Sequence, residues 1–232
     1  MARRRRRSDA ARVDTRVQLG PLELPNPIVA ASGTFGHGDE VARQSDPSRL
    51  GAVTTKSLAP YEWPGNPAPR LHMTTAGMLN AVGLQGPGVE HWVDHDLPAL
   101  RARGARVIAS VWGRSTEEFG RAAKLLTPAR EELVAVEVNV SCPNLEDRST
   151  MFAHSAAATA GVTTAVLDAD LDLPVFVKLS PNVTDLREIA AAALTAGATG
   201  LTLVNTLLGL VVDAERGAGC RGPRSNPSRC GP

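Results

Sequence analysis

The sequence predicts an α/β protein with a parallel sheet, of the (β/α)₈ TIM barrel type. Short runs rich in Val, Ile and Leu alternate with longer amphipathic segments, as in repeated strand–helix–strand units. The runs are apolar throughout, which is typical of strands covered on both faces. Polar side chains follow most of the runs, and a barrel gathers all such strand ends at one mouth. No Gly-rich fingerprint follows the first run, which argues against an open dinucleotide-binding sheet.

In the first strand–helix units, prolines and glycines interrupt the regular pattern. Residues 19–27 resemble a hairpin-like entry with one glycine and three prolines as breakers. We expect strands over 27–31 and 50–55 and a helix over 39–50. Residues 59–88 then form a Pro- and Gly-rich excursion that is too long for an ordinary connection, so we expect a binding loop there.

The later units alternate regularly. The predicted strands cover 105–111, 133–140, 175–179 and 200–204, and the predicted helices cover 89–103, 115–126, 153–169 and 183–196. Ser115 is expected to cap its helix, with Glu118 completing a capping box. Thr184 is the expected cap of the last helix, and Gly197 is the expected stop.

Both ends of the chain differ from this pattern. Residues 1–16 contain an arginine run and predict a disordered basic tail. Residues 17–212 hold about six βα units of the eight that close a barrel. Residues 213–232 contain no Val, Leu, Ile or Phe and cannot bury a core. We therefore expect an incomplete barrel, with a foreign or frame-shifted tail in place of its last quarter.

Composition excludes several classes of protein. The formal net charge is +1, so no bulk attraction to nucleic acid is expected. Three cysteines give no paired framework, which fits a reducing cytoplasm. No apolar run reaches the roughly 18 residues of a membrane span. No apolar region follows the arginine run, so it does not predict a secretory signal.

The stretch 137–144 concentrates reactive groups at the end of a predicted buried strand. Asn139, Ser141, Cys142 and Asn144 lie where ligands bind in α/β proteins. A thiol there can take a proton, and amides can orient a flat polar ring. The alternative is a small buried cysteine in a turn.

Two lysines are further candidates. Lys178 lies inside an apolar run, where a charge is costly unless it is paired. It would stabilise a ligand that becomes anionic, or it would form a structural ion pair. Lys56 ends another run and is either a ligand contact or a solvated residue at the barrel rim.

Several segments together resemble the class 1 dihydroorotate dehydrogenases, most closely the NAD-linked class 1B. The segments are 31–36 (ASGTFG), 55–57 (TKS), 65–67 (GNP), 77–85 (GMLNAVGLQ), 139–144 (NVSCPN), 177–184 (VKLSPNVT) and 204–209 (VNTLLG). The class 2 membrane enzymes carry serine where Cys142 stands. The resemblance runs from about residue 17 to 212.

The resemblance implies oxidation of (S)-dihydroorotate to orotate in pyrimidine (UMP) biosynthesis, with FMN as the cofactor. Cys142 would be the base that removes the C5 proton while a hydride leaves C6 for the flavin, and Lys178 would offset the charge of the reduced flavin. The implied flavin contacts are Ser32, Lys56, Ser57, Ser110, Asn139, Lys178 and Val204. The implied substrate contacts are Lys56, Asn80, Ala81, Val82, Gly83, Leu84, Asn139, Asn205 and Thr206. No metal is implied.

The sequence departs from the family in two places. Ser110 stands where the family usually has an asparagine at the flavin. The family's phosphate-binding loops follow strands seven and eight, which we do not find. We therefore expect the chain on its own to be poorly soluble and flavin-free.

Partners and rival functions follow from the same resemblance. Class 1B enzymes pass electrons to NAD through a subunit with FAD and an iron–sulfur cluster, and the full-length family forms homodimers or heterotetramers. One alternative is a dihydropyrimidine dehydrogenase-like module, although those enzymes typically have His where Asn144 stands and a later base cysteine. The other alternative is an inactive fragment that binds a partner or nothing.

Overall fold

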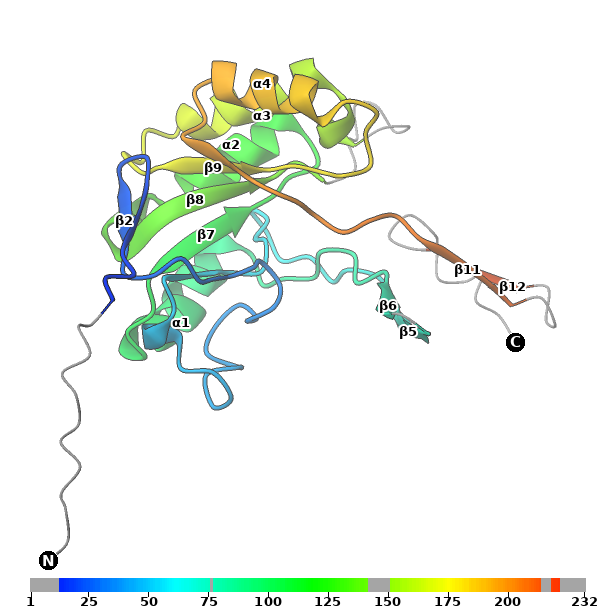
Figure 1. Cartoon of the computed structure of the whole chain (residues 1–232), viewed down its shortest axis with the longest axis horizontal. Helices are drawn as coiled ribbons and strands as arrows, with labels where there is room; N and C mark the ends of the chain where they lie inside the picture. Colours follow the sequence, from blue (N-terminus) through cyan, green and yellow to red (C-terminus); the bar gives the residue numbers. More distant parts are fainter. Residues whose placement is uncertain (1–12, 76, 142–150, 214–217, 222–232) are drawn as a thin grey trace, which may run out of the picture.

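The computed structural model describes residues 13–75, 77–141, 151–213 and 218–221 (Figure 1). Its centre is a six-stranded sheet in the order β10-β9-β8-β7-β4-β3, and every neighbouring pair is parallel. The strands are β3 (Val29–Ala30), β4 (Ala52–Thr54), β7 (Val107–Val111), β8 (Leu133–Asn139), β9 (Val175–Lys178) and β10 (Gly200–Thr202). Neighbours in space follow the order of the chain, so the predicted incomplete (β/α)₈ barrel is confirmed.

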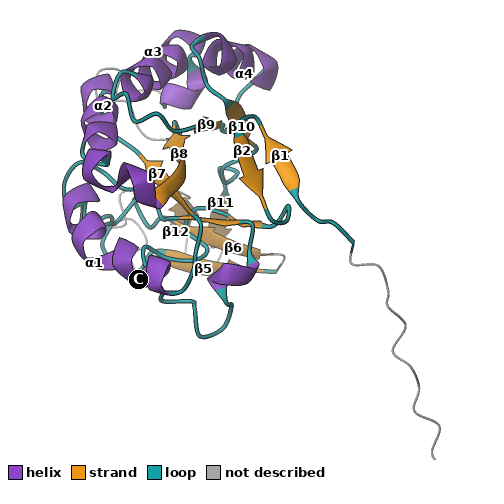
Figure 2. Cartoon of the chain, turned by 90° about the vertical axis from the view of Figure 1, so that its left-hand side faces the viewer, coloured by secondary structure: helices purple, strands orange, loops and turns teal. Residues whose placement is uncertain are grey.

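Four helices cover the outer face of the curved sheet (Figure 2). They are α1 (Val89–Ala102), α2 (Thr116–Lys124), α3 (Ala156–Leu167) and α4 (Leu186–Thr195). Large apolar side chains such as Trp92, Phe119 and Phe152 are buried in one core cluster with the strand residues Val107 and Val138. The apolar strands thus form because helices cover them, as the sequence predicts.

Ser115 caps α2 as the sequence predicts, but Glu118 reaches the amide before the cap instead of the cap amide of a capping box, and the cap of α4 differs from the prediction. The Ser115 hydroxyl accepts from the Glu118 amide at 3.3 Å, while the Glu118 carboxylate accepts from the Arg114 amide at 2.7 Å. For α4 the expectation of Thr184 as the cap is wrong, because the Asp185 carboxylate accepts from a first-turn amide. Gly197 follows α4 with φ +107, as expected of a helix stop.

The predicted helix over 39–50 is wrong. The segment consists of turns and one short 3₁₀ helix, η1 (Pro47–Arg49). The Asp46 side chain accepts from the Ser48 amide at 3.0 Å, which starts a new turn there. Pro47 has no N–H to continue a helix from the preceding residues. Two other 3₁₀ helices, η2 (Thr127–Glu132) and η3 (Phe152–His154), precede β8 and α3.

Three antiparallel hairpins lie outside the sheet. β1 (Val17–Leu19) pairs with β2 (Leu22–Leu24), as the hairpin-like entry predicts. β5 (Leu71–Thr74) pairs with β6 (Gly77–Asn80) inside the long excursion, where no strand was expected. β11 (Leu210–Asp213) pairs with β12 (Ala218–Arg221). β12 lies within residues 213–232, for which the sequence predicts a disordered tail.

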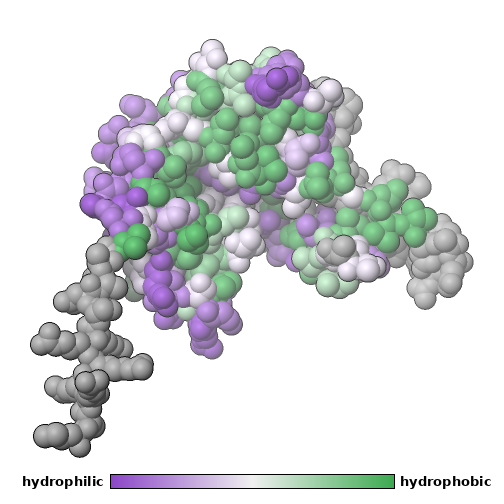
Figure 3. All heavy atoms as spheres, viewed as in Figure 1, coloured by the Kyte–Doolittle hydropathy of each residue, from purple (hydrophilic) through white to green (hydrophobic). Residues whose placement is uncertain are grey.

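The connection between β10 and β11 is an exposed apolar arm. Figure 3 shows apolar side chains along the arm that carries β11. Leu203, Leu207 and Leu210 are exposed. None of the helices formed by the described residues has both the length and the apolar character needed to cross a membrane.

Candidate active site

A cavity of about 410 Å³ lies at the carboxyl ends of the parallel strands. Its walls come from the loops after β3, β4, β9 and β10, from the end of β8 and from the long excursion. The lining residues are Ser32, Gly33, Thr34, Lys56, Ser57, Leu71, Met78, Asn80, Val82, Gly83, Leu84, Asn139, Ser141, Met151, Lys178, Ser180, Asn182, Asn205, Thr206 and Leu208. The volume is typical of a small-molecule site. The predicted gathering of strand ends at one mouth is thus observed.

Two asparagines are fixed against each other in the wall. Asn205 Nδ2 donates to Asn139 Oδ1 at 3.0 Å. Backbone amides of Ser141 and Thr206 donate to the side-chain oxygens of Asn139 and Asn205, at 3.2 and 2.8 Å. An N–H can only donate, so these bonds set which way each side-chain amide faces. Both side chains present oriented polar groups to the cavity.

Three serines lie behind and beside these amides. Asn139 Nδ2 donates to Ser57 Oγ at 3.0 Å, and the Ser57 and Ser110 hydroxyls are 3.0 Å apart. The Ser32 hydroxyl donates to the Thr55 carbonyl at 2.7 Å. Ser110 is completely buried and does not line the cavity. The serines therefore connect the cavity wall to the interior of the sheet.

A buried carboxylate lies below the serines. Glu137 is 3% exposed, and its Oε1 accepts from Ser110 Oγ at 3.2 Å. Burial raises the pKa of Glu137, while the charge of Lys178 and hydrogen bonds from Thr202 and Ser110 act in the opposite direction. Lys178 itself is 8% exposed and lines the cavity. Lys178 therefore lines the cavity, while the Glu137 carboxyl lies behind its wall.

The long excursion is tied down over the cavity. Trp63 Nε1 donates to the Gly83 carbonyl at 2.9 Å, and Asn66 Nδ2 donates to the Ala81 carbonyl at 2.8 Å. Gly65 has φ +69, and a Cβ there would lie 2.5 Å from the Val82 carbonyl. Only glycine fits this close approach. These contacts hold residues 80–84 at the cavity.

Most of the predicted site residues meet at this cavity. Those that line it are Ser32, Lys56, Ser57, Asn80, Val82, Gly83, Leu84, Asn139, Lys178, Asn205 and Thr206. Ala81 and Val204 do not line it, and Ser110 reaches it only through Ser57. Cys142 and Asn144 lie outside the described residues. Cys142 directly follows Ser141, which lines the cavity.

Three polar residues that line the cavity, Thr34, Ser180 and Asn182, and the buried Glu137 behind it were not among the predicted site residues. Asn182 lines the cavity, and its Nδ2 donates to Ser180 Oγ at 3.0 Å. Glu137 was overlooked although it is a charged residue within an apolar run. Its spacing of two from Asn139 places both on the same face of β8. That alternation was a usable signal.

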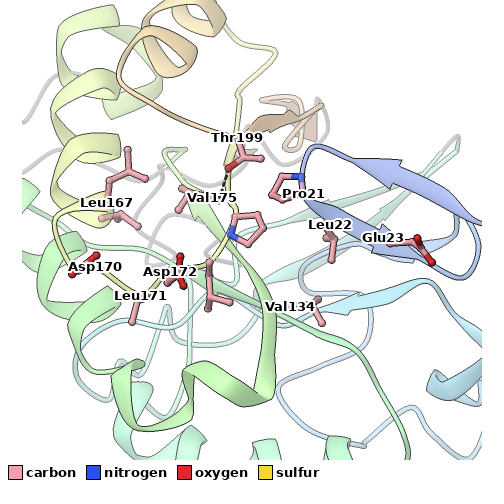
Figure 4. Close-up of a pocket in the computed structure, with 13 residues that line it drawn as sticks. Pro21, Leu22, Glu23, Val134, Leu167, Asp170, Leu171, Asp172, Val175 and Thr199 are labelled. Carbon is pink, nitrogen blue, oxygen red and sulfur yellow. Dashed lines mark hydrogen bonds between the residues drawn. The ribbon is translucent and has the colours of Figure 1, made fainter.

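A second cavity, of about 520 Å³, lies at the other end of the strands. It sits between the β1–β2 hairpin and the segment that leads into β9 (Figure 4). Glu23, Asp170 and Asp172 are its charged residues. None of the predicted site residues lines it, so the predicted site corresponds to the first cavity.

The donor set suits a flat ring with carbonyl and imide edges. Side-chain amides, hydroxyls and the two lysines Lys56 and Lys178 line the first cavity. The Ser141 hydroxyl is buried and has no hydrogen-bond partner among the described residues. Within the same residues, no group of His, Cys, Asp and Glu side chains is arranged to hold a metal ion. The site therefore fits an organic ring such as a flavin.

Comparison with known proteins agrees with this geometry. The family model for dihydroorotate dehydrogenase matches residues 15–223. A protein of Alkaliphilus metalliredigens named dihydroorotate dehydrogenase B (NAD(+)), catalytic subunit, is 42% identical over 205 residues, which are 88% of this chain and 67% of that protein. Proteins of the same name from Desulforamulus reducens and Lachnoclostridium phytofermentans are 43% and 40% identical, over 86% and 93% of this chain and 65% and 73% of their own lengths.

The chain thus spans about two thirds of the length of these curated relatives. The matched region contains the whole six-stranded sheet and every described residue of the cavity wall. Sequence, fold and site point to the same group of flavin-dependent oxidoreductases. The chain belongs to the dihydroorotate dehydrogenase family.

Proposed function

We propose that this cavity oxidises (S)-dihydroorotate to orotate with FMN bound beside the substrate. The observation that carries the proposal is the convergence of Asn80, Asn139, Asn205 and Lys178 on one cavity at the strand ends. Orotate is a flat ring with imide, carbonyl and carboxylate edges. Side-chain amides and hydroxyls can pair with each of these edges.

The residues of this chain would have separate roles in the reaction. Asn80, Asn139, Asn205 and Thr206 would orient the substrate ring. Cys142 would take the C5 proton as a thiolate base, since a thiol is far more acidic than a hydroxyl. FMN, when bound, would supply the acceptor for the hydride that leaves C6. The products are then orotate, a protonated thiol and a flavin reduced by two electrons.

Lys178 would provide charge stabilisation for that reaction. Its ammonium is buried at the cavity floor. Negative charge accumulates on a flavin only when the flavin is reduced, so a fixed cation stabilises the product more than the reactant. Lys56, Ser32 and Ser57 would hold the oxidised ring in place. Lys56 packs against Gly33, where an added Cβ would lie 3.5 Å from Lys56 Nζ.

The electron acceptor is also a proposal. The names of the relatives include NAD(+) and the words catalytic subunit. We propose that a separate subunit with FAD and an iron–sulfur cluster passes the electrons on to NAD. Co-purification of such a subunit, followed by NADH formation from dihydroorotate, tests this part.

The experiment for the reaction itself compares two substrates. The purified chain is mixed with FMN without oxygen and receives (S)-dihydroorotate or dihydrouracil. Loss of the oxidised flavin band with dihydroorotate alone supports the proposal. Reduction by dihydrouracil instead would favour the dihydropyrimidine dehydrogenase-like alternative. In a parallel sample, the remaining third of a relative follows residue 212. Comparing the two samples distinguishes weak FMN binding by the given chain from a failure to oxidise the substrate.

A further inference from the structure

Three consecutive carbonyls of the long excursion accept hydrogen bonds from a neighbouring arm of the same excursion. Asn66 Nδ2 donates to the Ala81 carbonyl at 2.8 Å, and the Asn66 backbone amide donates to the Val82 carbonyl at 3.0 Å. Trp63 Nε1 donates to the Gly83 carbonyl at 2.9 Å. All three carbonyls therefore face this outer arm, which carries Trp63 and Asn66.

The amides that follow these carbonyls must face the other way. In a trans peptide unit, the carbonyl of one residue and the N–H of the next point in opposite directions, and the cis peptide bonds of the described residues lie elsewhere. The N–H groups of Val82, Gly83 and Leu84 thus point away from the outer arm. These three residues line the cavity, whereas Trp63 and Asn66 do not. Three backbone donors are therefore directed at the cavity, and no described residue accepts from them.

The turn at Gly83 and Leu84 needs support from its surroundings. Gly83 has φ +75 and Leu84 has φ +60, in the left-handed region that a leucine rarely adopts. Such a conformation persists only where surrounding contacts hold it. The bond from Trp63 to the peptide unit between these two residues is such a contact. Loss of the indole N–H would therefore allow this peptide unit to rotate, and the Leu84 amide would rotate with it.

Trp63 is itself fixed by a neighbouring element. The Arg114 guanidinium lies over its ring, 5.0 Å from the centroid, and the Trp112 ring meets it edge-on at 6.0 Å. The Arg114 backbone amide and the Tyr61 hydroxyl both donate to Glu118 in α2, at 2.7 and 2.8 Å. The connection between β7 and α2 thus sets the direction in which the indole N–H points.

We infer that Trp63 is a positioning residue of the dihydroorotate site: its indole N–H holds the Gly83 carbonyl and thereby turns the Leu84 amide toward an oxygen of the bound ligand. Trp63 does not line the cavity, so it acts through this one peptide unit. An amide that already points at the ligand needs less ordering when the ligand binds. The inference rests on the proposed function for the identity of the ligand.

The first test follows the indole N–H signals by NMR while orotate is added. The chain has three tryptophans, and the Trp63 signal is the one that Trp63→Phe removes. An amide that donates to a ligand polarises its own peptide unit and strengthens the hydrogen bond at the carbonyl of that unit. The Trp63 indole proton should therefore shift downfield when orotate binds. The Trp92 indole, which donates to the His37 carbonyl at 2.8 Å, should shift much less.

The second test compares two variants that each lose one hydrogen bond from an indole to a backbone carbonyl. Trp63→Phe keeps an aromatic ring in place but leaves the Gly83 carbonyl without its donor. Orotate affinity should fall about 10-fold, whereas FMN affinity should not change, since residues 82–84 are not among the proposed flavin contacts. Trp92→Phe, in the buried core, is the matched control. It should lower the denaturation midpoint to a similar extent and leave orotate affinity unchanged.

Both tests use the full chain with FMN added and, in parallel, the form in which the remaining third of a relative follows residue 212. If Trp63→Phe does not fold, replacement of Trp63 by β-(3-benzothienyl)alanine keeps the shape of the indole and puts sulfur in place of the N–H. A Trp63 indole signal that does not shift downfield with orotate would overturn the inference. Equal orotate affinities of the Trp63 and Trp92 variants would also overturn it, as would an extended form that binds FMN but not orotate.

The two proposals fail separately. A downfield indole shift with orotate in a protein that dihydroorotate does not reduce supports the positioning role and contradicts the proposed reaction. Reduction by dihydroorotate without an indole shift contradicts the role of Trp63 alone.

Discussion

The side chains of Asn139 and Asn205 are hydrogen-bonded to each other at 3.0 Å, although 66 residues separate them in the chain. Asn139 is the last residue of β8, and Asn205 comes after β10, which lies two strands away in the sheet. The bond therefore forms only when the sheet is assembled. It joins two of the amides that we assign to the substrate.

Asn139→Ala should weaken both the fold and the site. The change leaves the Ser141 amide and Asn205 Nδ2 without their acceptor, so the free energy of unfolding should fall by about 1–3 kcal/mol. Orotate affinity should fall about 10-fold or more, since an oriented donor is lost. Chemical denaturation and orotate titration measure the two effects.

Asn26→Ala is the control for this substitution. Asn26 is also held through its side chain: its Nδ2 donates to the Arg49 carbonyl and its Oδ1 accepts from the Ile28 amide, but it is half-buried and does not line the cavity. Asn26→Ala should change the free energy of unfolding by about 0.5 kcal/mol or less and leave the orotate affinity unchanged. Equal effects of the two substitutions on orotate binding would contradict the assignment of Asn139.

Lys178→Met should weaken FMN binding and slow flavin reduction together, because the ammonium faces charge that appears on reduction. It also removes the cation that favours the ionised form of Glu137, so the Glu137 pKa should rise further. Flavin midpoint potential and reduction rate are the measurements. Lys124→Met, at an exposed position near the end of α2, is the control. An unchanged potential and rate would make Lys178 a structural residue.

The pH dependence of Lys178→Met has a defined sign. A carboxyl whose folded-state pKa is raised stabilises the fold below its unfolded pKa, and this stability is lost as pH rises through the folded pKa. The unfolding free energy of Lys178→Met should therefore decrease as pH rises above 4.5, more steeply than in the wild type. The double variant with Glu137→Gln should lose this extra slope.

Tyr61 provides a direct optical test of the excursion. It is the chain's only tyrosine, and its hydroxyl donates to Glu118 Oε2 at 2.8 Å. Burial, and then the hydrogen bond to Glu118, raise the pKa of Tyr61 to about 12. Ultraviolet titration of the folded protein should show ionisation near that value rather than near 10.0. The stability from this bond is present below the ordinary pKa and is lost as pH rises through the raised one.

Glu118→Gln should bring the Tyr61 pKa closer to its ordinary value, since it removes a nearby negative charge. Glu23→Gln, at an exposed site on β2, should not change it. A wild-type tyrosine that titrates near 10.0 would show that the excursion is not held against α2.

The open edge of the sheet predicts self-association. Among the described residues, β10 pairs only with β9, and β3 pairs only with β4. Unpaired edges beside exposed apolar residues promote association, and Leu203 next to β10 is 67% exposed. Light scattering should give a mass above the 24.4 kDa of one chain. Leu203→Lys should lower that mass, because a charge at an edge opposes edge pairing.

Leu194→Lys is the control for the edge. Leu194 is also exposed, at 47%, but lies on α4 rather than beside a strand edge. It should leave the measured mass unchanged. A wild-type chain that is monomeric at the same concentration would contradict the edge argument.

The sequence pattern predicted those elements of the fold that depend on residues near one another in the chain. The apolar runs gave the six parallel strands, and Ser115 with Glu118 marked the start of α2. The hairpin β5–β6 was missed because its strands are largely exposed and their pairing depends on cross-strand contacts. The predicted helix at 39–50 failed at Pro47, where a side-chain turn competes with helix formation.

The sequence predicted which residues belong to the site better than it predicted the contacts between them. Residues at strand ends could be expected at one mouth because barrel topology places them there. The contact of Ser110 with Glu137 joins β7 to β8 across the register of the assembled sheet. No spacing within either strand specifies that contact. The role of Cys142 as the catalytic base stays a prediction from the sequence.

The central claim is that dihydroorotate gives its C5 proton to Cys142 while its electrons reduce the flavin. The most direct measurement is rapid mixing of (S)-dihydroorotate with FMN-loaded protein without oxygen, in the form in which the remaining third of a relative follows residue 212, for the wild-type sequence, Cys142→Ala and the control Asn26→Ala. We predict that the wild-type sequence and Asn26→Ala reduce the flavin and that Cys142→Ala keeps FMN but is slower by about 10²–10⁴-fold. Cys142→Ser should recover some rate at high pH. Flavin reduction by Cys142→Ala at the wild-type rate at neutral pH would contradict the claim.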